Sequence, residues 1–419
     1  MGRSLRIALL SYRSKPHSGG QGVYVRALSR ELRELGHRVE VVSGQPYPEL
    51  DAEVPLTRLP SLDLYREPDP FRTPHWREFR DWVDVLEYGA MCTAAFPEPL
   101  TFSLRAARLL RARRGDPDNG FDDGSDSGFD IVHDNQSLGW GLLRTGLPTV
   151  ATIHHPVAVD RDLELAHASF RRSLTLRRWY AFTGMQARVA RRLPAITTVS
   201  ASSQRDIERL MGVPATRTEV IPVGIDPAVF CPATGPRDAD HVVVTTSADV
   251  PLKGLVPLLE AVAKLRTERE VRLTVVGSAK AGGLAATAVE RLSLADAVTF
   301  TGPLPQADLV ALLQRVTVAV VPSLYEGFSL PAIEAMACAT PLVTTDAGAL
   351  PEVVGSHAAV QVPAGDVDRL AGALALVLDQ RGLQQQLGRA GRARVLERFT
   401  WRYTAERTAA WYEEVLARC

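Results

Sequence analysis

Two glutamates are the residues of this chain whose type and spacing point most directly to chemistry. Glu326 and Glu334 have seven residues between them, and they follow an apolar run, Thr317 to Val321, that predicts a buried parallel strand. Glu326 falls in the loop after this strand, and Glu334 falls on the helix predicted from Leu330 to Cys338. Carboxylates accept hydrogen bonds from hydroxyl groups, so this pair is suited to the hydroxyls of a sugar and a ribose.

The same loop is suited to a phosphate. The backbone N–H groups of Phe328, Ser329 and Leu330 lie at the start of the predicted helix, whose positive end attracts anions. Pro331 stands in the first turn, where its missing N–H costs nothing. The strand, loop and helix therefore predict an anion site at the carboxyl end of a strand, which is where open α/β sheets bind ligands.

The whole string around the glutamates, P-S-x-x-E-G-F-x-x-x-x-x-E-A-M-A, resembles the signature of the retaining glycosyltransferases of family 4, which have the GT-B fold. The glutamate spacing alone would also fit a plain crossover with two solvated side chains. The resemblance implies two Rossmann-like, doubly wound α/β domains that face each other across a cleft. It also implies retention of anomeric configuration without a fixed protein nucleophile or a metal ion. The matching residues are Pro322, Ser323, Glu326, Gly327, Phe328, Glu334, Ala335, Met336 and Ala337.

A lysine and an alanine bear on how the donor diphosphate is bound. The family commonly places an arginine and a lysine on this group, in the pattern G-R-x-x-x-x-K-G. This chain reads S-A-D-V-P-L-K-G, so Lys253 matches the lysine while Ala248 stands in place of the arginine. This departure from the family pattern leaves three alternatives: Lys253 and the loop amides suffice, another arginine takes over the missing contact, or the chain is an inactive member of the family.

The first part of the chain predicts a strand, a loop and a helix. Leu5 to Ser11 and His37 to Ser43 read as strands, and Val23 to Leu35 reads as the helix between them. Gly20 lies in the loop, where the backbone can approach a ligand closely. The glycines do not form G-x-G-x-x-G and the second strand ends without an acid, which argues against NAD. The loop resembles the GT-B loop that faces the reacting centre and the acceptor, although a plain tight turn fits it equally well.

Two histidines follow the strand predicted from Thr149 to Ile153. His154 and His155 are neighbours and therefore point to opposite faces of an extended chain, which disfavours a shared metal ion. The family often has a histidine after this strand, near the donor sugar and the transferring centre. His154 is in the matching register, so the resemblance implies a substrate contact for it, with a structural role as the alternative.

The chain is too long for one ordinary domain, because it has 419 residues. We expect an N-terminal Rossmann-like acceptor domain over residues 1–230, a hinge at 231–240 and a nucleotide-sugar domain over 241–398. In the family, a last helix like that of residues 399–419 crosses back to the N-terminal domain. Residues 46–99 are rich in proline and aromatic side chains, and we expect them to be irregular.

Composition limits the partners and the compartment. The formal net charge is zero, so binding of nucleic acid through bulk charge is not indicated. Four scattered cysteines and the lack of a long apolar stretch or signal peptide predict a cytoplasmic protein. Residues 165–205 contain eight arginines and no acid, interleaved with aromatic residues. Such helices bind anionic membranes, so a peripheral place on the inner face of the membrane is one expectation and a solvated basic face is the other.

These features together predict a retaining hexosyltransferase that uses a nucleotide-diphosphate sugar and needs neither a metal ion nor a cofactor. Lys253 and the loop amides would hold the diphosphate, Glu326 the sugar hydroxyls and Glu334 the ribose. The motifs do not separate UDP, GDP and ADP, nor lipid, glycan and small-molecule acceptors. The rival functions are a nucleotide-sugar epimerase or hydrolase on the same fold, and a non-catalytic protein that binds a nucleotide sugar or a glycan.

Overall fold

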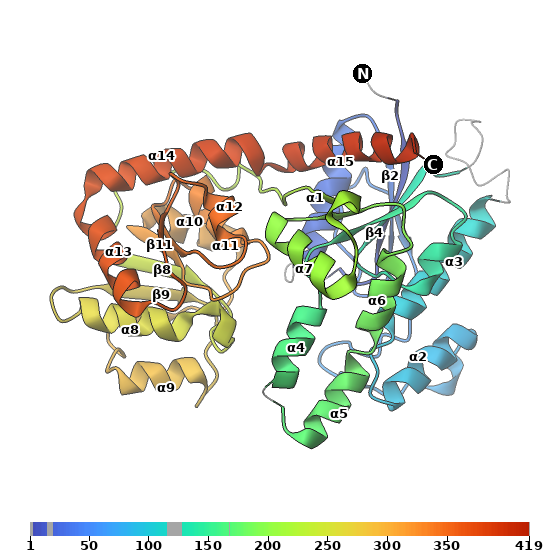
Figure 1. The fold of residues 1–419 in the computed structure, drawn as a ribbon, viewed down its shortest axis with the longest axis horizontal. Coiled ribbons are helices and arrows are strands. Elements are labelled where there is room, and N and C mark those ends of the chain that lie inside the picture. The colour runs from blue at the N-terminus through green and yellow to red at the C-terminus, as the bar shows by residue number, and fades with distance from the viewer. Residues whose placement is uncertain (1–2, 15–19, 115–127, 167, 419) are drawn as a thin grey trace. The chain divides into compact units, whose positions relative to one another are not determined.

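The computed structural model describes residues 3–14, 20–114, 128–166 and 168–418. Its backbone contacts divide the chain into two compact units, and each is built on its own sheet of parallel strands (Figure 1). The first unit consists of Met1–Val199, Ser203–Ile221 and Thr404–Cys419, and the second of Ser200–Ser202 and Pro222–Tyr403.

The sheet of the first unit has seven strands in the order β3-β2-β1-β4-β5-β6-β7. The inner strands β4 and β5 are buried along their whole length, as parallel strands covered on both faces usually are. The strands are β1 (Arg6–Ser11), β2 (Arg38–Ser43), β3 (Leu56–Arg58), β4 (Ile131–Asn135), β5 (Thr149–Ile153), β6 (Ile196–Thr198) and β7 (Thr218–Val220).

Helices cover both faces of this sheet. α3, α6 and α7 bury apolar side chains against one face, and α1 packs beside β1 and β2. The helices are α1 (Gln21–Glu34), α2 (Trp82–Cys92), α3 (Glu98–Arg114), α4 (Ala158–Ala166), α5 (Phe170–Trp179), α6 (Phe182–Ala190), α7 (Ala201–Met211) and α15 (Trp401–Leu416), with short 3₁₀ turns η1 (Trp76–Glu78), η2 (Trp140–Arg144) and η3 (Ala215–Arg217).

One expectation about a segment differs from the structure. The stretch from residue 46 to residue 99, which we expected to be irregular, contains β3, η1 and all of α2. The reason is a local cap that the aromatic composition hides, because the Asp81 carboxylate accepts the backbone N–H groups of Val83 at 2.8 Å and Asp84 at 3.3 Å.

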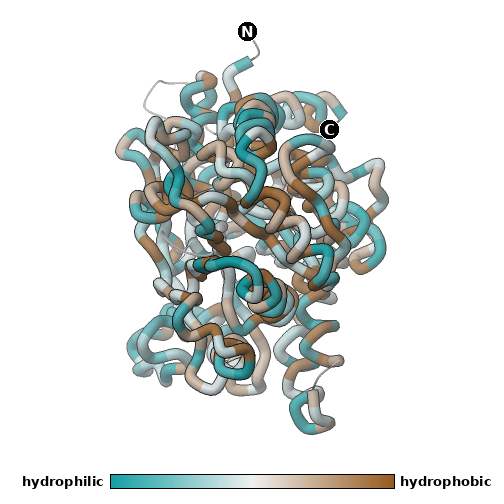
Figure 2. The backbone as a smooth tube through the Cα atoms, turned by 90° about the vertical axis from the view of Figure 1, so that its left-hand side faces the viewer, coloured by the Kyte–Doolittle hydropathy of each residue, from teal (hydrophilic) through white to brown (hydrophobic). Residues whose placement is uncertain are grey.

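The sheet of the second unit has six strands in the order β10-β9-β8-β11-β12-β13. α8, α9 and α13 pack on one face, and α10, α11 and α12 pack on the other. Within single helices the tube in Figure 2 changes between brown and teal, as expected of helices with one buried side. The elements are β8 (His241–Thr245), η4 (Pro251–Lys253), α8 (Leu255–Leu265), β9 (Arg272–Val276), α9 (Leu284–Arg291), β10 (Val298–Phe300), α10 (Gln306–Arg315), β11 (Val318–Val321), α11 (Leu330–Ala337), β12 (Leu342–Thr345), α12 (Leu350–Val354), β13 (Val360–Val362), α13 (Val367–Asp379) and α14 (Arg381–Arg398).

Candidate active site

The predicted strand, loop and helix around the two glutamates are present as β11, residues 322–329 and α11. Ser329 is the N-cap of α11, and its hydroxyl accepts the backbone N–H of Ala332 at 3.4 Å. Within the described residues, the backbone N–H groups of Phe328, Ser329 and Leu330 have no acceptor. The loop therefore ends in unsatisfied donors at the positive end of a helix, which is the arrangement that binds phosphate.

Glu326 and Lys253 form an ion pair in this loop. The Lys253 ammonium donates to Glu326 Oε1 at 2.9 Å, and the Ser323 hydroxyl donates to the same oxygen at 2.8 Å. Glu326 is 9% exposed, whereas the Lys253 side chain is 36% exposed. The structure thus brings together the lysine and the glutamate that the sequence assigned to different parts of the donor. Ser323 is the partner whose role was not predicted.

Tight backbone packing holds Lys253 beside the loop. Gly254 adopts φ 67°, and a Cβ atom added to it would lie 1.9 Å from the carbonyl oxygen of Pro322. One turn away, the backbone N–H of Leu324 donates to the carbonyl of Leu252 at 2.7 Å. Only glycine permits this conformation and this close approach, so the K-G dipeptide is explained by geometry.

A second contact holds the backbone of Glu326. Its carbonyl oxygen accepts the N–H of Ala349 at 2.8 Å, and a Cβ atom on Gly348 would lie 2.2 Å from the same oxygen. Glu326 is therefore fixed by its side chain and by its backbone, and both sets of contacts lie within the second unit.

Glu334 faces a different environment on α11. Its side chain is half-buried, and its carboxylate has no hydrogen-bond partner in the part of the chain that the structure describes. Burial raises the pKa of Glu334 to about 7. A carboxyl group that is half protonated near neutral pH can accept from one ribose hydroxyl and donate to another.

Ala248 does not supply a contact to an anion. It is 4% exposed and belongs to the apolar core of the second unit. The next residue, Asp249, has a structural role, because its carboxylate accepts the backbone N–H groups of Lys280 at 2.7 Å and Ala285 at 3.2 Å. Lys280 itself is exposed in the loop after β9, and the sequence had not drawn attention to it as a cation.

In the first unit, His154 follows β5 as predicted and is half-buried. Its Nε2 lies 2.7 Å from the amide oxygen of Asn135, and its backbone N–H donates to the Gln136 side chain at 2.7 Å. Burial lowers the pKa of His154 to about 4, so the ring is neutral at physiological pH. In the tautomer whose Nε2–H donates to the Asn135 oxygen, Nδ1 is the acceptor of this imidazole. His155 instead contacts Asp160 at 3.2 Å on the surface.

Asn135 is a polar residue of this site that the sequence analysis missed. Its amide nitrogen is buried and has no hydrogen-bond partner among the described residues. A buried unpaired donor is costly, so its presence beside His154 favours a ligand hydroxyl as its partner. The run His133–Asn135 at the carboxyl end of an apolar strand was the signal in the sequence.

The glycine loop and His154 are connected through α1. Gly20 adopts φ 72° and is the N-cap of this helix. Tyr24, one turn further on, packs its ring edge-on against His154 with 4.5 Å between the centroids. The Tyr24 hydroxyl contacts Thr152 at 3.1 Å, and the same threonine contacts the buried His133 at 2.6 Å. The predicted Gly20 region and His154 therefore belong to one side-chain network.

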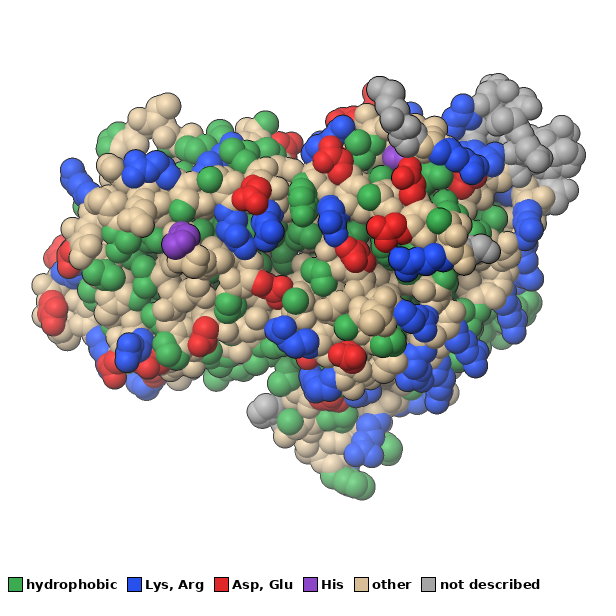
Figure 3. Space-filling view, turned by 45° about the horizontal axis from the view of Figure 1, so that its top comes forward, with side chains coloured by type: hydrophobic (Ala, Val, Ile, Leu, Met, Phe, Trp, Pro, Cys, Tyr) green, Lys and Arg blue, Asp and Glu red, His purple; other side chains and the backbone are tan. Residues whose placement is uncertain are grey.

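The arginine-rich region, residues 165–205, contains α5, α6 and β6 together with the end of α4 and the start of α7. Phe170 and Leu174 on α5 are 91% and 71% exposed. Figure 3 shows a part of the molecule that projects downward and carries hydrophobic and basic side chains at its tip. Further basic side chains lie close together along the side of the first unit. Among the described helices, none has the length and the apolar character needed to span a membrane. Nor do three histidine, cysteine or acidic side chains gather anywhere in the described ranges in a way that could hold a metal ion.

Comparison with known proteins decides the family. Residues 18–229 match the family model Glycosyltransferase Family 4, and residues 232–394 match Glycosyl transferases group 1. Over 420 residues the chain is 51% identical to the MMP alpha-(1->4)-mannosyltransferase of Mycolicibacterium hassiacum, with 99% of each protein covered. The chain belongs to glycosyltransferase family 4. This family 4 protein is accordingly a retaining glycosyltransferase, as the glutamate motif predicted.

Solved structures support the fold of this family 4 glycosyltransferase. Sucrose-phosphate synthase from Thermosynechococcus elongatus matches with a TM-score of 0.69 and 22% identity, over 99% of this chain and 100% of that one. Anabaena Alr3699/HepE in complex with UDP-glucose matches with a TM-score of 0.66 and 16% identity, over 99% and 100% of the two chains. At these identities the likeness concerns the fold, and it confirms the predicted GT-B class of two Rossmann-like α/β domains.

Proposed function

We propose that this glycosyltransferase moves a mannosyl group from a nucleotide-diphosphate mannose to a methylmannose polysaccharide and forms an α-(1→4) bond. The 51% identity to the Mycolicibacterium hassiacum enzyme, over nearly the full length of both proteins, supports the sugar, the linkage and the acceptor. The single structural observation that carries the proposal is the cluster of Lys253, Glu326 and Ser323 beside the N-terminus of α11. The loop of residues 322–329 offers free N–H groups and a carboxylate, and Lys253 at the end of η4 adds a cation.

The diphosphate binds to the N–H groups of Phe328, Ser329 and Leu330 and to Lys253. These backbone donors are fixed by the helix and need no reorganisation as negative charge develops on the leaving group. Lys253 is exposed enough to turn from Glu326 to a phosphate oxygen. Lys280 supplies further positive charge on the loop after β9, in place of the arginine absent at Ala248.

The two glutamates bind the hydroxyl groups of the donor. Glu326, held by Ser323 and by its own backbone, accepts from hydroxyls of the transferred mannose. Glu334 contacts the ribose, because its carboxyl group is partly accessible and has no other partner in the described ranges. The two roles follow from the burial of each group and from its place on the loop or on the helix.

His154 and Asn135 serve the transferred sugar from the first unit. The bare Nδ1 of His154 accepts a sugar hydroxyl, and the unpaired amide of Asn135 donates to one. In the transfer, the bond from the sugar C1 to the diphosphate oxygen breaks and a bond from C1 to the acceptor oxygen forms on the same face. The proton of the acceptor hydroxyl passes to the departing diphosphate, and the sugar passes through an oxocarbenium-like state.

The test has two stages. Thermal unfolding with UDP, GDP and ADP and their mannose conjugates identifies the nucleotide, because a ligand at about 100 times its dissociation constant adds roughly 2.7 kcal/mol of stability. The stabilising conjugate is then incubated with a methylmannose oligosaccharide, and the product is analysed by mass spectrometry and NMR. The expected product is one mannose longer and has an α-(1→4) linkage. Release of free mannose without elongation would replace the proposal with the hydrolase alternative.

A further inference from the structure

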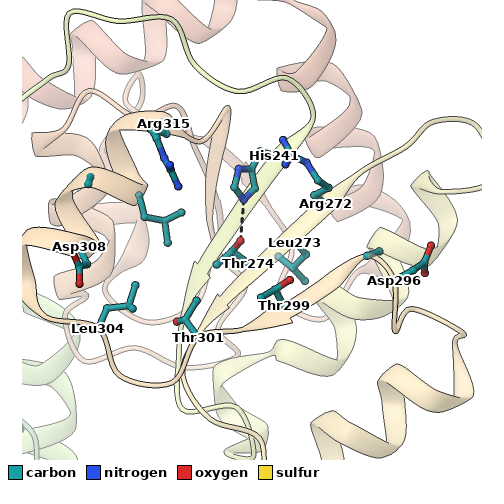
Figure 4. A pocket seen from close by; sticks show the side chains of 13 residues that line it. His241, Arg272, Leu273, Thr274, Asp296, Thr299, Thr301, Leu304, Asp308 and Arg315 are labelled. Carbon is teal, nitrogen blue, oxygen red and sulfur yellow. Dashed lines mark hydrogen bonds between the residues drawn. The ribbon is translucent and has the colours of Figure 1, made fainter.

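A water-accessible hollow of about 480 Å³ lies in the second unit, between α10 and the face of β8, β9 and β10 (Figure 4). Parallel sheets are normally covered on both faces by apolar contacts. Here the open face carries polar side chains instead, among them His241, Thr274, Thr299 and Thr301. A face of this kind is suited to water or to a polar ligand, and the volume lies in the range of small-molecule sites.

One end of the hollow is cationic. In Figure 4 the side chains of Arg272 and Arg315 lie on either side of the His241 ring. Neither arginine forms an ion pair or a side-chain hydrogen bond within the described residues. His241 is 7% exposed, and its two ring nitrogens contact Thr274 Oγ1 at 2.8 Å and Asp238 Oδ2 at 3.1 Å. Both guanidinium groups act electrostatically on the Asp238 carboxylate, which is bound to His241, but neither forms an ion pair with it.

The acidic groups of the region are mostly engaged elsewhere. Asp238 is bound to His241, and Asp296 accepts two hydrogen bonds from Arg266 at 2.7 and 2.6 Å. Asp308 lies at the other end of the hollow, in the first turn of α10, where the helix favours a negative charge. The cationic end therefore holds two positive groups against the single carboxylate of Asp238.

The opposite end is suited to hydroxyl groups and to an apolar ring face. Thr299, Thr301 and Asp308 offer hydroxyl and carboxylate oxygens, and Leu304 offers an apolar surface. Among the described residues, His241 is the one aromatic ring that lines the hollow, and because it is 7% exposed it offers little surface on which to stack a nucleobase. The chemistry at the two ends matches a small molecule with a phosphate at one end and several hydroxyls at the other.

We propose that this hollow binds a hexose phosphate, with the phosphate at the end that carries Arg272, His241 and Arg315 and the sugar hydroxyls toward Thr299 and Asp308. This site is distinct from the donor site. Arg272 and His241 are the first residues of β9 and β8, whereas the donor loops follow the last residues of these strands. Five residues of extended chain separate the two ends by about 13 Å.

The proposal is tested by calorimetric titration of the full chain with mannose 6-phosphate, and with mannose and inorganic phosphate as its separate halves. We expect mannose 6-phosphate to bind more tightly than either half, with the same affinity in the presence of a saturating nucleoside diphosphate. R272Q/R315Q should raise its Kd at least about tenfold. R291Q is the matched control, because Arg291 is an exposed arginine of the same unit that pairs with Glu260, and it should leave the Kd unchanged.

The replacement of Thr299 by Val tests the other end of the hollow. It removes a hydroxyl and keeps the branched shape that suits a strand, so T299V should weaken mannose 6-phosphate and leave inorganic phosphate unchanged. A crystal of the wild-type protein soaked in mannose 6-phosphate should show the phosphorus atom at the end of the hollow that carries the two guanidinium groups. This measurement does not depend on any variant.

Three results would overturn the proposal. The first is no binding of mannose 6-phosphate even at about 10 mM, where a site of millimolar affinity would be mostly filled. The second is displacement by the nucleoside diphosphate, which would place the ligand in the donor site. The third is equal affinity for inorganic phosphate, which would mean an adventitious ion only. None of these measurements uses the transfer reaction, so failure here and failure of the proposed function are distinguishable.

Discussion

Lys253 Nζ lies 2.9 Å from Glu326 Oε1, so the groups that we assign to the diphosphate and to the transferred sugar are bound to each other. A donor must replace both halves of this pair. Its phosphate takes the place of the carboxylate on Lys253, and its sugar hydroxyls take the place of the ammonium on Glu326. A nucleoside diphosphate without a sugar frees the lysine and leaves the buried glutamate with only Ser323, so the pair favours the intact donor.

The first prediction concerns the exchange of Glu326 for Gln. We expect the turnover of E326Q to fall about 100-fold or more, because a preorganised contact to the sugar is lost. Its affinity for the nucleoside diphosphate should stay equal or rise, because Lys253 is released. K253Q should lose both turnover and affinity for the nucleoside diphosphate. K264Q alters an exposed lysine that is paired with Asp368, and it should change neither quantity. Near-normal turnover of E326Q would remove Glu326 from the mechanism.

The second prediction concerns pH and Glu334. Burial raises the pKa of this carboxyl group from an ordinary value of 4.5 to about 7, so folding disfavours its charged form. The stability that depends on this group is fully present below about pH 4.5 and is lost as the pH rises through about 7. E334Q is neutral throughout, so it should gain up to about 3 kcal/mol over the wild type between these limits. Denaturant unfolding at about pH 5 and about pH 8 checks this, and a pH-independent difference would contradict the assigned pKa.

The third prediction compares two neighbouring histidines. H154A should lower kcat/KM about 100-fold, because we assign the imidazole to the transferred sugar, and N135A should lower it about tenfold by removing the partner of this imidazole. H155A is the matched control, because that ring contacts Asp160 at the surface. Burial lowers the pKa of His154 to about 4, so between about pH 5.5 and 8 this ring should add no step to the pH profile. Equal losses in H154A and H155A would reject the specific role.

The fourth prediction is structural. G254A puts a Cβ atom 1.9 Å from the Pro322 carbonyl oxygen and requires an alanine at φ 67°. We expect a loss of about 2 kcal/mol or more in unfolding free energy, with weaker binding of the donor because Lys253 moves. G372A serves as the control, since this glycine lies within α13 and its Cβ would meet open space. That change should be neutral or stabilising by up to about 1 kcal/mol. Equal effects of the two changes would disprove the packing argument.

The fifth prediction concerns the exposed end of α5. Phe170, Leu174 and Arg177 are spaced four and three residues apart, so they share one exposed face of the helix. We expect the protein to float with vesicles rich in anionic lipid at low salt and to be released at high salt. F170S/L174S should lose this binding, whereas L376S, at an exposed leucine of the second unit, should keep it. If F170S/L174S floats as well as the wild type, or if the wild type does not float at all, the alternative of a solvated basic face is supported.

Much of the second unit was predictable from local signals. The apolar run before Pro322, the glutamates and Pro331 define β11, the loop and α11 by patterns that act over a few residues. The pairing of Lys253 with Glu326 was not predictable, because it depends on contact between segments 73 residues apart. Taken separately, Lys253 predicts a phosphate ligand and Glu326 predicts a sugar ligand. Neither residue indicates by itself that the two side chains contact each other.

The first unit shows the same limit. His154 was found because it directly follows an apolar strand. Asn135 and Tyr24, which contact it, lie on another strand and on a helix, and only the sheet order places β4 beside β5. α2 was missed for a different reason, since the many aromatic side chains around it obscured the cap at Asp81.

The return of α15 to the first unit has a consequence for synthesis. Tyr412 is fully buried there and bonds to the equally buried His133, so the first unit is incomplete without residues from the end of the chain. The last earlier segment of that unit ends at Ile221 and the next begins at Thr404, 183 positions later (404 − 221). At about 5–20 residues per second, a ribosome needs roughly 10–40 s for this interval. During this interval residues 222–403 of the second unit are synthesised, and the surface of the nascent first unit that binds α15 stays uncovered.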